Sequence, residues 1–438
     1  MTAAPQTAFI GMTHLGLVVS IGWADLSGDQ ILCLDQDERL LTKLEQGILP
    51  ISEPGLSELL KKNKRNIFYS EDFSLIKSVS CVFFVVDTAV DRTGSTKELS
   101  RLISSALPYL RNDATVIIMS QVPVGFCRSM RKKIAKAQPR LSISLYYWVN
   151  TIVIGTALDR FLRPERIIIG KEDVHKPLSL TLSHLLKSFS CPILAMSYES
   201  AEMTKSAVNL FLAASITAAN TLADLCEVSG ADIGEIIPAL RLDERIGPKA
   251  YVNPTIRIAG GHLERELFRL QRLAKQHTIS TALVDCILQL NETRYRWALQ
   301  KIKQYVLVKN SRPTICVWGL AYKKHTNATD NAASLKIIQK LIKSASLRVY
   351  DSQATLPEAL SKAVTYSDKF AALDRADCLL ILTDWEEFST TESINLLRQI
   401  KGLVIIDGVG ALRFHRAEFT KGHYFTMGVS AELSLATL

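Results

Sequence analysis

Short apolar runs and longer helical stretches alternate at both ends of this chain. Each apolar run is three to six residues long and is followed by polar or turn residues. This pattern is typical of buried strands. The runs are residues 8–10, 30–34, 81–86 and 115–119 in the first half and 314–318, 347–350, 378–382 and 404–406 in the second. The alternation predicts an α/β protein with two parallel-sheet domains.

Between these two regions lies a stretch with a different pattern. Residues Ser197 to Ser229 contain neither glycine nor proline, and at 1.5 Å per residue they predict one helix about 45 to 50 Å long. Lys205 and Asn209 are four positions apart and therefore share one face, and Asn220 falls close to the same stripe. Buried polar groups need partners, so the stripe indicates a ligand or a polar contact. A solvated or inter-subunit stripe is the alternative.

The first strand leads into a glycine turn, GMTHLG, from Gly11 to Gly16. An apolar helix follows, and the second strand ends at Asp35. In a dinucleotide-binding fold such a turn brings main-chain N–H groups to the pyrophosphate, and the acid accepts from the ribose hydroxyls. Thr13 stands where the middle glycine is expected. The alternative is a nucleotide-like fold that binds no dinucleotide.

The composition indicates a globular protein but does not identify its ligand. The chain has 438 residues, 47% hydrophobic and 22% charged, with a net charge of +9, which indicates a globular protein of two or three domains. Its charge suits a phosphorylated ligand, but the basic residues are not interleaved with aromatics as in nucleic-acid platforms. Eight scattered cysteines favour reduced thiols over a zinc or disulfide framework. We expect a cytoplasmic protein without a membrane span, signal peptide, metal site or nucleic-acid partner.

Seven further motifs occur in one order along the chain. They are ISEPGLSELL (51–60), SQVPVGF (120–126), FLRPERIIIG (161–170), AEMTKSAVNLFLA (201–213), LDERIG (242–247), GLAYK (319–323) and LTDWEEF (382–388). Together they resemble the UDP-glucose/GDP-mannose dehydrogenase family from about residue 8 to about residue 410. Seven motifs in order are far more specific than one glycine turn.

The resemblance implies a fold and a reaction. It implies two Rossmann-like domains, residues 1–198 for NAD and 306–438 for the nucleotide sugar, joined by a central helical dimerisation domain, residues 199–305. Members oxidise a sugar alcohol to a carboxylate in two NAD-dependent steps, with a cysteine that captures the aldehyde. The implied product serves polysaccharide or glycoconjugate synthesis, and a homodimer is implied.

The resemblance also assigns site residues. Lys205 and Asn209 match residues that stabilise the oxyanion and position the reacting oxygen or water. The cofactor set is Gly11, Thr13, Gly16, Asp35 and Gln121, and the substrate set is Arg245, Gly260, Gly261 and Lys323.

Several family residues are replaced in this chain. Leu263 stands in the place of the cysteine, and both carboxylates of the family's NPEFLREG segment are missing from WVNTIVIG (148–155). Asp330 and Val409 stand where the family has arginines. His262, and less so Glu264, are candidate acids or bases beside Leu263, and Cys127 is a candidate thiol with an ordinary buried cysteine as its alternative.

Three functions are compatible with these observations. The first is NAD-dependent oxidation of a nucleotide sugar, with four-electron chemistry in doubt because a leucine supplies no nucleophile. The second is a two-electron dehydrogenase or reductase, which needs Lys205 and Asn209 but no cysteine. The third is a catalytically silent nucleotide-binding homologue or partner subunit.

Overall fold

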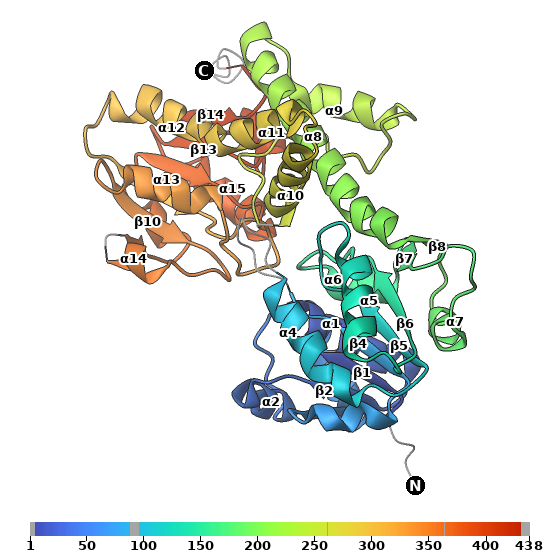
Figure 1. Ribbon diagram of the computed structural model, residues 1–438. Helices are drawn as coiled ribbons and strands as arrows, with labels where there is room; N and C mark the ends of the chain where they lie inside the picture. The colour runs from blue at the N-terminus through green and yellow to red at the C-terminus, as the bar shows by residue number, and fades with distance from the viewer. Residues whose placement is uncertain (1–4, 88–95, 261, 363, 431–438) are drawn as a thin grey trace. The chain divides into compact units, whose positions relative to one another are not determined.

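The chain folds into two compact units, residues 1–208 and 209–438. The computed structural model describes residues 5–87, 96–260, 262–362 and 364–430, and of His262 and Tyr366 it describes the main chain alone. Figure 1 shows the N-terminal unit in blue to green and the other in green to red.

An eight-stranded sheet forms the centre of the N-terminal unit. Its strands have the order β3-β2-β1-β4-β5-β6-β7-β8, and all neighbours are parallel except β6 and β7. The first six strands have the 3-2-1-4-5-6 order of dinucleotide-binding folds. The strands are β1 (Thr7–Ile10), β2 (Ile31–Leu34), β3 (Ile67–Ser70), β4 (Cys81–Phe84), β5 (Ala114–Ile118), β6 (Ile143–Trp148), β7 (Ile167–Lys171) and β8 (Ile193–Ser197).

Helices cover both faces of this sheet, because alternate strand residues point to opposite sides. Phe9 and Cys33 pack in one buried cluster, while Ala8 and Ile10 pack in the other. The helices of this unit are α1 (His14–Ser27), α2 (Glu38–Glu45), α3 (Leu56–Asn63), α4 (Lys97–Ala106), α5 (Phe126–Ala137), α6 (Ala157–Leu162) and α7 (Leu180–Leu186). Strands β1, β2, β4 and β5 are buried on both faces, as apolar strands without strict alternation predict.

A buried carboxylate, Glu53, ties the loop before α6 to the start of α1. Its side chain is fully buried; it accepts from the amides of Gly155 at 2.8 Å and Ala157 at 2.6 Å. His14 Nε2 lies 3.2 Å from the same carboxylate. Burial pushes the pKa of the Glu53 carboxyl up, but His14 and the two amides outweigh burial and hold that pKa below its ordinary value.

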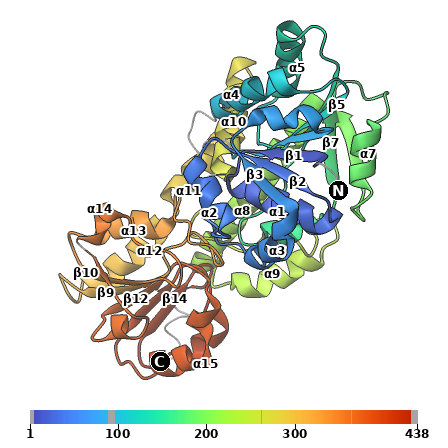
Figure 2. The same cartoon turned by 90° about the horizontal axis from the view of Figure 1, so that it is seen from below.

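The C-terminal unit contains a second parallel sheet. Its order is β11-β10-β9-β12-β13-β14, which is again 3-2-1-4-5-6 when counted from β9. Figure 2 shows β10, β9, β12 and β14 in succession across it. The strands are β9 (Thr314–Trp318), β10 (Ser346–Tyr350), β11 (Thr365–Tyr366), β12 (Cys378–Ile381), β13 (Val404–Asp407) and β14 (His423–Thr426), with helices α13 (Ala333–Leu341), α14 (Glu358–Ser361) and α15 (Thr391–Leu397).

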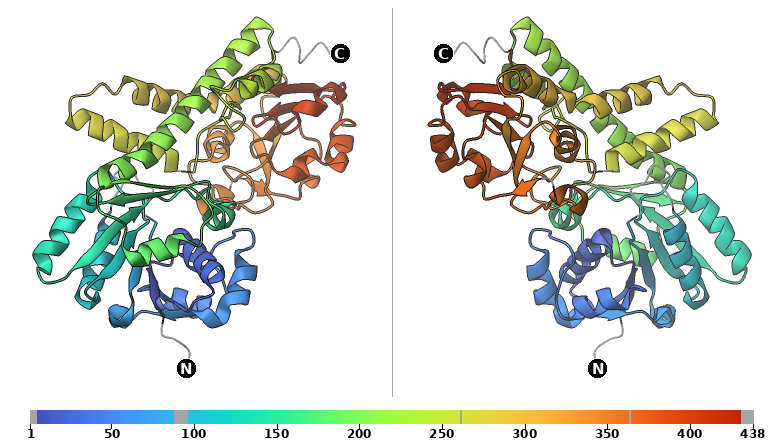
Figure 3. Two further views of the ribbon diagram at one scale, coloured as in Figure 1. Left: turned by 90° about the vertical axis from the view of Figure 1, so that its right-hand side faces the viewer. Right: turned by 90° about the vertical axis from the view of Figure 1, so that its left-hand side faces the viewer.

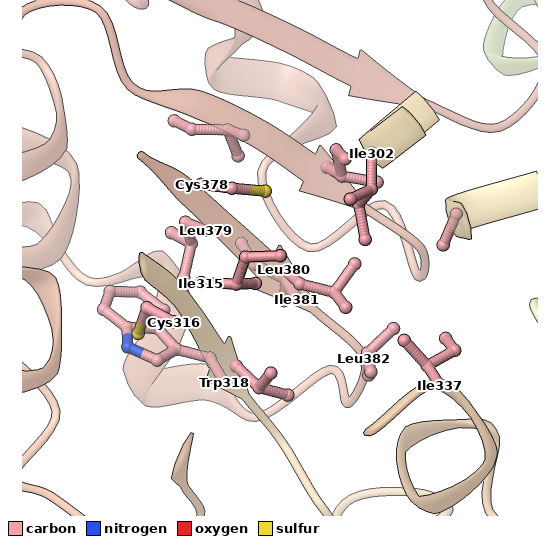
Figure 4. Packing of buried hydrophobic residues seen from close by; sticks show 14 of the residues in the cluster. Ile302, Ile315, Cys316, Trp318, Ile337, Cys378, Leu379, Leu380, Ile381 and Leu382 are labelled. Carbon is pink, nitrogen blue, oxygen red and sulfur yellow. The ribbon is translucent and has the colours of Figure 1, made fainter. Parts of the chain in front are cut away.

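The core of this sheet is densely apolar. Cys316, Trp318, Leu379, Leu380 and Ile381 are fully buried, and Figure 4 shows the side chains of β9 and β12 pointing to both sides of the sheet, with Ile302 and Ile337 of the covering helices on one side. The central pair β9 and β12 therefore has the continuous burial of a parallel sheet covered on both sides.

Helices precede this sheet in the same unit. They are α9 (Ile233–Leu242), α10 (His262–Gln276), α11 (Ala282–Thr293) and α12 (Arg296–Ile302). Helices α10 and α11 lie side by side as a helical hairpin (Figure 3). A small buried cluster that includes Ala213, Ile258 and Leu267 joins the hairpin to the long helix α8 (Tyr198–Ser229).

The predicted long helix is confirmed as α8, and its first turns are fixed inside the N-terminal unit. Glu202 is fully buried and accepts from the amides of Gly125 and of Cys127, the latter at 2.8 Å, so it caps the N-terminus of α5. Within the described residues, α8 is the one helix long and apolar enough to span a membrane by composition. Core helices of folded domains pass the same criterion, and the buried contacts of Glu202 give α8 a packing role.

The predicted strands in both halves are confirmed to within two residues at their ends. The apolar pattern did not indicate β3, β6, β7, β8, β11 or β14. The domain bounds 1–198, 199–305 and 306–438 stay a prediction.

Replacing Glu53 with glutamine tests its structural role. The ionised carboxylate stabilises the fold above the unfolded-state pKa, and this contribution is lost as the pH falls through the depressed folded-state pKa. We expect Glu53→Gln to lower the free energy of unfolding by about 1–3 kcal/mol at neutral pH, and the loss to shrink below about pH 4. Urea unfolding across this pH range measures it, with exposed Glu71→Gln as the control. An unchanged unfolding free energy at neutral pH would contradict the assignment.

Candidate functional site

Gly11 makes the turn after β1, at the carboxyl edge of the N-terminal sheet. Its φ is 99°, a value that favours glycine, and a Cβ there would lie 2.9 Å from the Val86 Cβ. Its amide donates to the Leu34 carbonyl at 2.8 Å. A Cβ on Gly16 would lie 1.8 Å from the Gly11 carbonyl oxygen. Gly11 is therefore required by close packing of the turn on the segment after β4, and Gly16 by close packing of α1 on the turn.

Asp35 comes directly after β2 beside this turn, as predicted. Its Oδ2 accepts from the Met12 amide at 2.6 Å, its Oδ1 accepts from the Asp37 amide at 3.0 Å, and its side chain stays partly exposed. A carboxylate in this position is available to ribose hydroxyls. Gln121 lies just beyond β5 at the same edge and is 6% exposed. Fold and sequence therefore place these predicted cofactor residues at the carboxyl edge.

Thr13 has ordinary extended main-chain angles, φ −74° and ψ −173°, so its position does not need a glycine conformation. Its hydroxyl accepts from the Asp87 amide at 2.9 Å and lies 3.4 Å from the Val85 carbonyl oxygen. The Asp87 carboxylate in turn accepts from the Leu15 amide at 3.0 Å. Sequence reasoning did not find Asp87, whose partners are more than seventy positions away in the chain.

Cys127 does not have the properties of a nucleophile. It is completely buried, and burial together with the neighbouring Glu202 carboxylate raises the pKa of the thiol well above its ordinary value. A buried protonated thiol is inert. The ordinary buried cysteine, which we considered as the alternative, is what the structure contains.

On α8, Lys205 and Asn209 lie one turn apart on one continuous helix, as predicted. Lys205 is half-buried and Asn209 is 6% exposed. Asn220, further along the stripe, accepts from the Thr255 amide at 2.8 Å. The stripe therefore has a structural partner at its far end, and the roles of Lys205 and Asn209 stay predictions.

Gly260 lies against the GLAYK motif in the C-terminal unit. Its φ is 82°, and a Cβ there would lie 2.7 Å from the Tyr322 ring. Its amide donates to the Asp330 carbonyl at 3.0 Å. The Lys323 ammonium stands 5.6 Å from the centroid of the same Tyr322 ring. The fold thus brings together two of the predicted substrate residues, Gly260 of the glycine loop and Lys323 of the GLAYK motif.

Leu263, the residue in the cysteine's place, packs against the apolar cluster of Ile258 and Leu267. The neighbouring Glu264 is held by hydrogen bonds rather than directed at a reacting group. Its carboxylate accepts from buried Arg257 at 2.9 Å, Asn291 at 3.0 Å and Asn331 at 2.9 Å. This network gives Glu264 a structural role, and its role as an acid or base stays a prediction. Gly261 and the side chain of His262 lie outside the described residues.

Arg245 lies in the loop after α9. Its side chain is 88% exposed and pairs with Asp243 at 2.7 Å. Within its own unit it therefore lies on the surface, and its substrate role stays a prediction.

A separate cavity of about 360 Å³ lies in the C-terminal unit between α8, α11 and α12. Its lining includes Asn220, Asp224, Arg294 and Trp297, and none of the predicted site residues. Across the described ranges, no group of three or more His, Cys, Asp or Glu side chains could hold a metal ion.

A glycine turn like that of Gly11 also follows the first strand of the second sheet, but the acid beside it is buried. Gly319 has φ 100°, and its amide donates to the Tyr350 carbonyl at 2.8 Å. Asp351 corresponds to Asp35, but it is 2% exposed and accepts from the amides of Leu320 and Ala321 and from Trp385 Nε1. Its carboxylate is closed to a ribose, so of these two turns the N-terminal one has the accessible acid.

Three successive parts of the chain match the domain models of one protein family. Residues 6–189 match the NAD binding domain of the UDP-glucose/GDP-mannose dehydrogenase family, residues 199–293 its central domain, and residues 316–414 its UDP binding domain. The three matches occur in the order of the family's domains.

Full-length relatives match almost the whole chain. UDP-glucose 6-dehydrogenase TuaD of Bacillus subtilis (strain 168) is 32% identical over 415 residues, which cover 92% of this chain and 88% of the relative. UDP-glucose 6-dehydrogenase of Rhizobium meliloti (strain 1021) is 28% identical, covering 92% and 94%.

Solved structures share the fold. A UDP-glucose dehydrogenase from Pyrobaculum islandicum has a TM-score of 0.85 at 23% identity and covers 98% of both chains. UDP-D-ManNAc dehydrogenase from Pyrococcus horikoshii has a TM-score of 0.81 at 22% identity, covering 92% of this chain and 95% of the other. The chain belongs to the UDP-glucose/GDP-mannose dehydrogenase family and contains its NAD binding, central and UDP binding domains.

Proposed function

We propose that the chain oxidises an alcohol group of a nucleotide sugar with NAD as the hydride acceptor. Two features in different parts of the chain support this most: the glycine turn before α1 with the partly exposed Asp35 beside it, and a UDP binding domain whose GLAYK motif contacts Gly260. We also propose three domains, residues 1–198, 199–305 and 306–438, and a role in polysaccharide or glycoconjugate synthesis. The eight free cysteines favour a cytoplasmic location, where thiols stay reduced.

NAD, when bound, would accept a hydride from the sugar alcohol. Gly11, Gly16, Asp35 and Gln121 would hold it. In this proposal Lys205 stabilises the developing negative charge on the alcohol oxygen, and Asn209, one turn away, positions that oxygen. Gly260 lets the glycine loop approach Tyr322, while Arg245 and Lys323 offer positive charge to the nucleotide phosphates.

The proposed first oxidation produces an aldehyde and NADH and releases one proton. A second oxidation by the route implied for the family needs a thiolate to attack that aldehyde. Leu263 offers an apolar side chain packed on Ile258 and Leu267 instead, and Cys127 is buried, with the pKa of its thiol raised by burial and by Glu202. These observations favour a second candidate, a two-electron dehydrogenase that stops at the aldehyde.

The number of NADH molecules formed per sugar distinguishes these candidates. With UDP-glucose, GDP-mannose and their N-acetylated relatives as substrates, we expect at most one NADH per sugar consumed and an aldehyde product trapped by a hydrazine reagent. Two NADH and a uronate would contradict the two-electron candidate and keep the family reaction. No NADH with any substrate, together with no NAD binding, would favour the silent homologue.

Lys205→Ala tests the catalytic assignment on the same substrate. Removal of a group that stabilises charge in the transition state should lower kcat by about a hundredfold or more. Exposed Lys132→Ala on α5 is the control, because it removes a charge outside the proposed site. Equal kcat values for Lys205→Ala and the unchanged protein would remove Lys205 from the mechanism.

We also propose a homodimer that pairs through α8. Phe211, Leu222 and Leu225 are 75%, 39% and 56% exposed, and their spacing of eleven and three residues puts them, with Ala218, along one face of the helix. An exposed apolar stripe of this kind favours a protein contact.

A charge in this stripe should separate the dimer. We expect Leu225→Glu to shift the sedimentation equilibrium from dimer to monomer, because an unpaired carboxylate in an apolar contact is costly. Leu180→Glu, at a position 90% exposed on α7, is the matched control and should leave the dimer intact. A protein that is monomeric before any substitution would contradict the proposal.

A further inference from the structure

The N-terminus of α1 already holds a negative charge that belongs to the chain. The Leu15 amide is among the first amides of α1, which have no partner within the helix. This amide donates to the Asp87 carboxylate at 3.0 Å. In a dinucleotide fold, the same end of this helix receives the pyrophosphate. A side-chain carboxylate and a ligand phosphate therefore compete for one donor.

Thr13 fixes the residue that supplies this carboxylate. The Thr13 hydroxyl accepts from the Asp87 amide at 2.9 Å, and it can donate to the Val85 carbonyl oxygen at 3.4 Å. A glycine at position 13 would provide neither contact. The threonine in place of the middle glycine and the acid after β4 thus form one local arrangement rather than two unrelated changes.

Electrostatics determine the sign of the effect. A helix N-terminus stabilises one nearby anion through its dipole and its free amides. A pyrophosphate carries two negative charges, and an Asp87 carboxylate within about 4 Å of it would repel it by Coulomb interaction. The dinucleotide must therefore displace the carboxylate from the Leu15 amide and keep it away.

We propose that Asp87, positioned by Thr13, is an internal competitor of the dinucleotide pyrophosphate and sets the affinity of the chain for NAD. The inference rests on the proposed use of NAD and adds the residue that limits its binding. The competitor is part of the chain, so its effect does not depend on protein concentration.

Asp87→Asn tests the proposal, because asparagine keeps the shape of the side chain and removes its charge. We expect calorimetric titration with NAD to give a dissociation constant lower by about tenfold. The gain should shrink at high salt, where the repulsion between exposed charges is screened. Asp29→Asn is the matched control, since Asp29 is exposed just beyond the opposite end of α1, and its affinity for NAD should be unchanged.

Thr13→Val provides a second variant of similar size, without the hydroxyl that positions Asp87. It should also tighten NAD binding, and it should add little in the Asp87→Asn background, because both changes act on one contact. Circular dichroism spectra and melting temperatures check that each variant is folded.

The outcomes separate this inference from the proposed function. Equal or weaker NAD binding by both Asp87→Asn and Thr13→Val, with measurable binding by the unchanged protein, overturns the inference and leaves the proposed function standing. If Asp87→Asn binds NAD while the unchanged protein does not, the inference is strongly supported. Absence of NAD binding in every variant overturns both the inference and the proposed function.

Discussion

Two glycines with positive φ, Gly11 and Gly319, fix the points at which the chain leaves the central strand of each sheet. Each lies directly after that strand, and each packs where a Cβ would collide with the segment leaving the neighbouring strand, at Val86 for Gly11 and at Thr383 for Gly319. Each amide donates to the last residue of the next strand. The carboxyl edge of each sheet, where ligands bind in such folds, is built around this contact.

The segment after the glycine differs between the two turns, and this difference assigns their ligands. After Gly11, α1 begins at His14, so the N-terminus of a long helix follows the turn directly. After Gly319, the next helix begins only at Ala333, and the chain between them contains Tyr322 and Lys323. Asp35 is accessible, whereas Asp351 is enclosed by amides and Trp385. The first turn therefore suits a dinucleotide, and the second belongs to the UDP binding domain.

The parts of the fold that the sequence predicted depend on local patterns. The strands around Phe9 and Leu380, the helix that contains Lys205, and the Gly11 turn are indicated by apolar runs, by the absence of glycine and proline, and by glycine spacing. Strand β6, by contrast, runs into a longer mostly apolar stretch that continues to Leu158, so its end was not apparent from the apolar pattern. Strand β8 has a largely exposed pattern and therefore gave no signal of burial.

The parts of the site that the sequence did not predict depend on distant contacts. Glu53 meets Gly155 and Ala157 about a hundred positions away, and Glu202 meets Cys127 at a separation of 75. Asp87 is likewise joined to Leu15 only by the fold. No local spacing indicates such pairs, and Asp87 in particular changes the interpretation of Thr13 from a missing glycine to a residue with its own partner.

Amide hydrogen exchange of the whole chain, with NAD and with a UDP-sugar added separately, would show whether each turn binds its own ligand. We expect NAD to slow exchange at residues 12–17 and the UDP-sugar to slow exchange at residues 319–323, each ligand acting on its own turn. Protection of residues 319–323 by NAD, or no protection of residues 12–17, would contradict this assignment of the two turns.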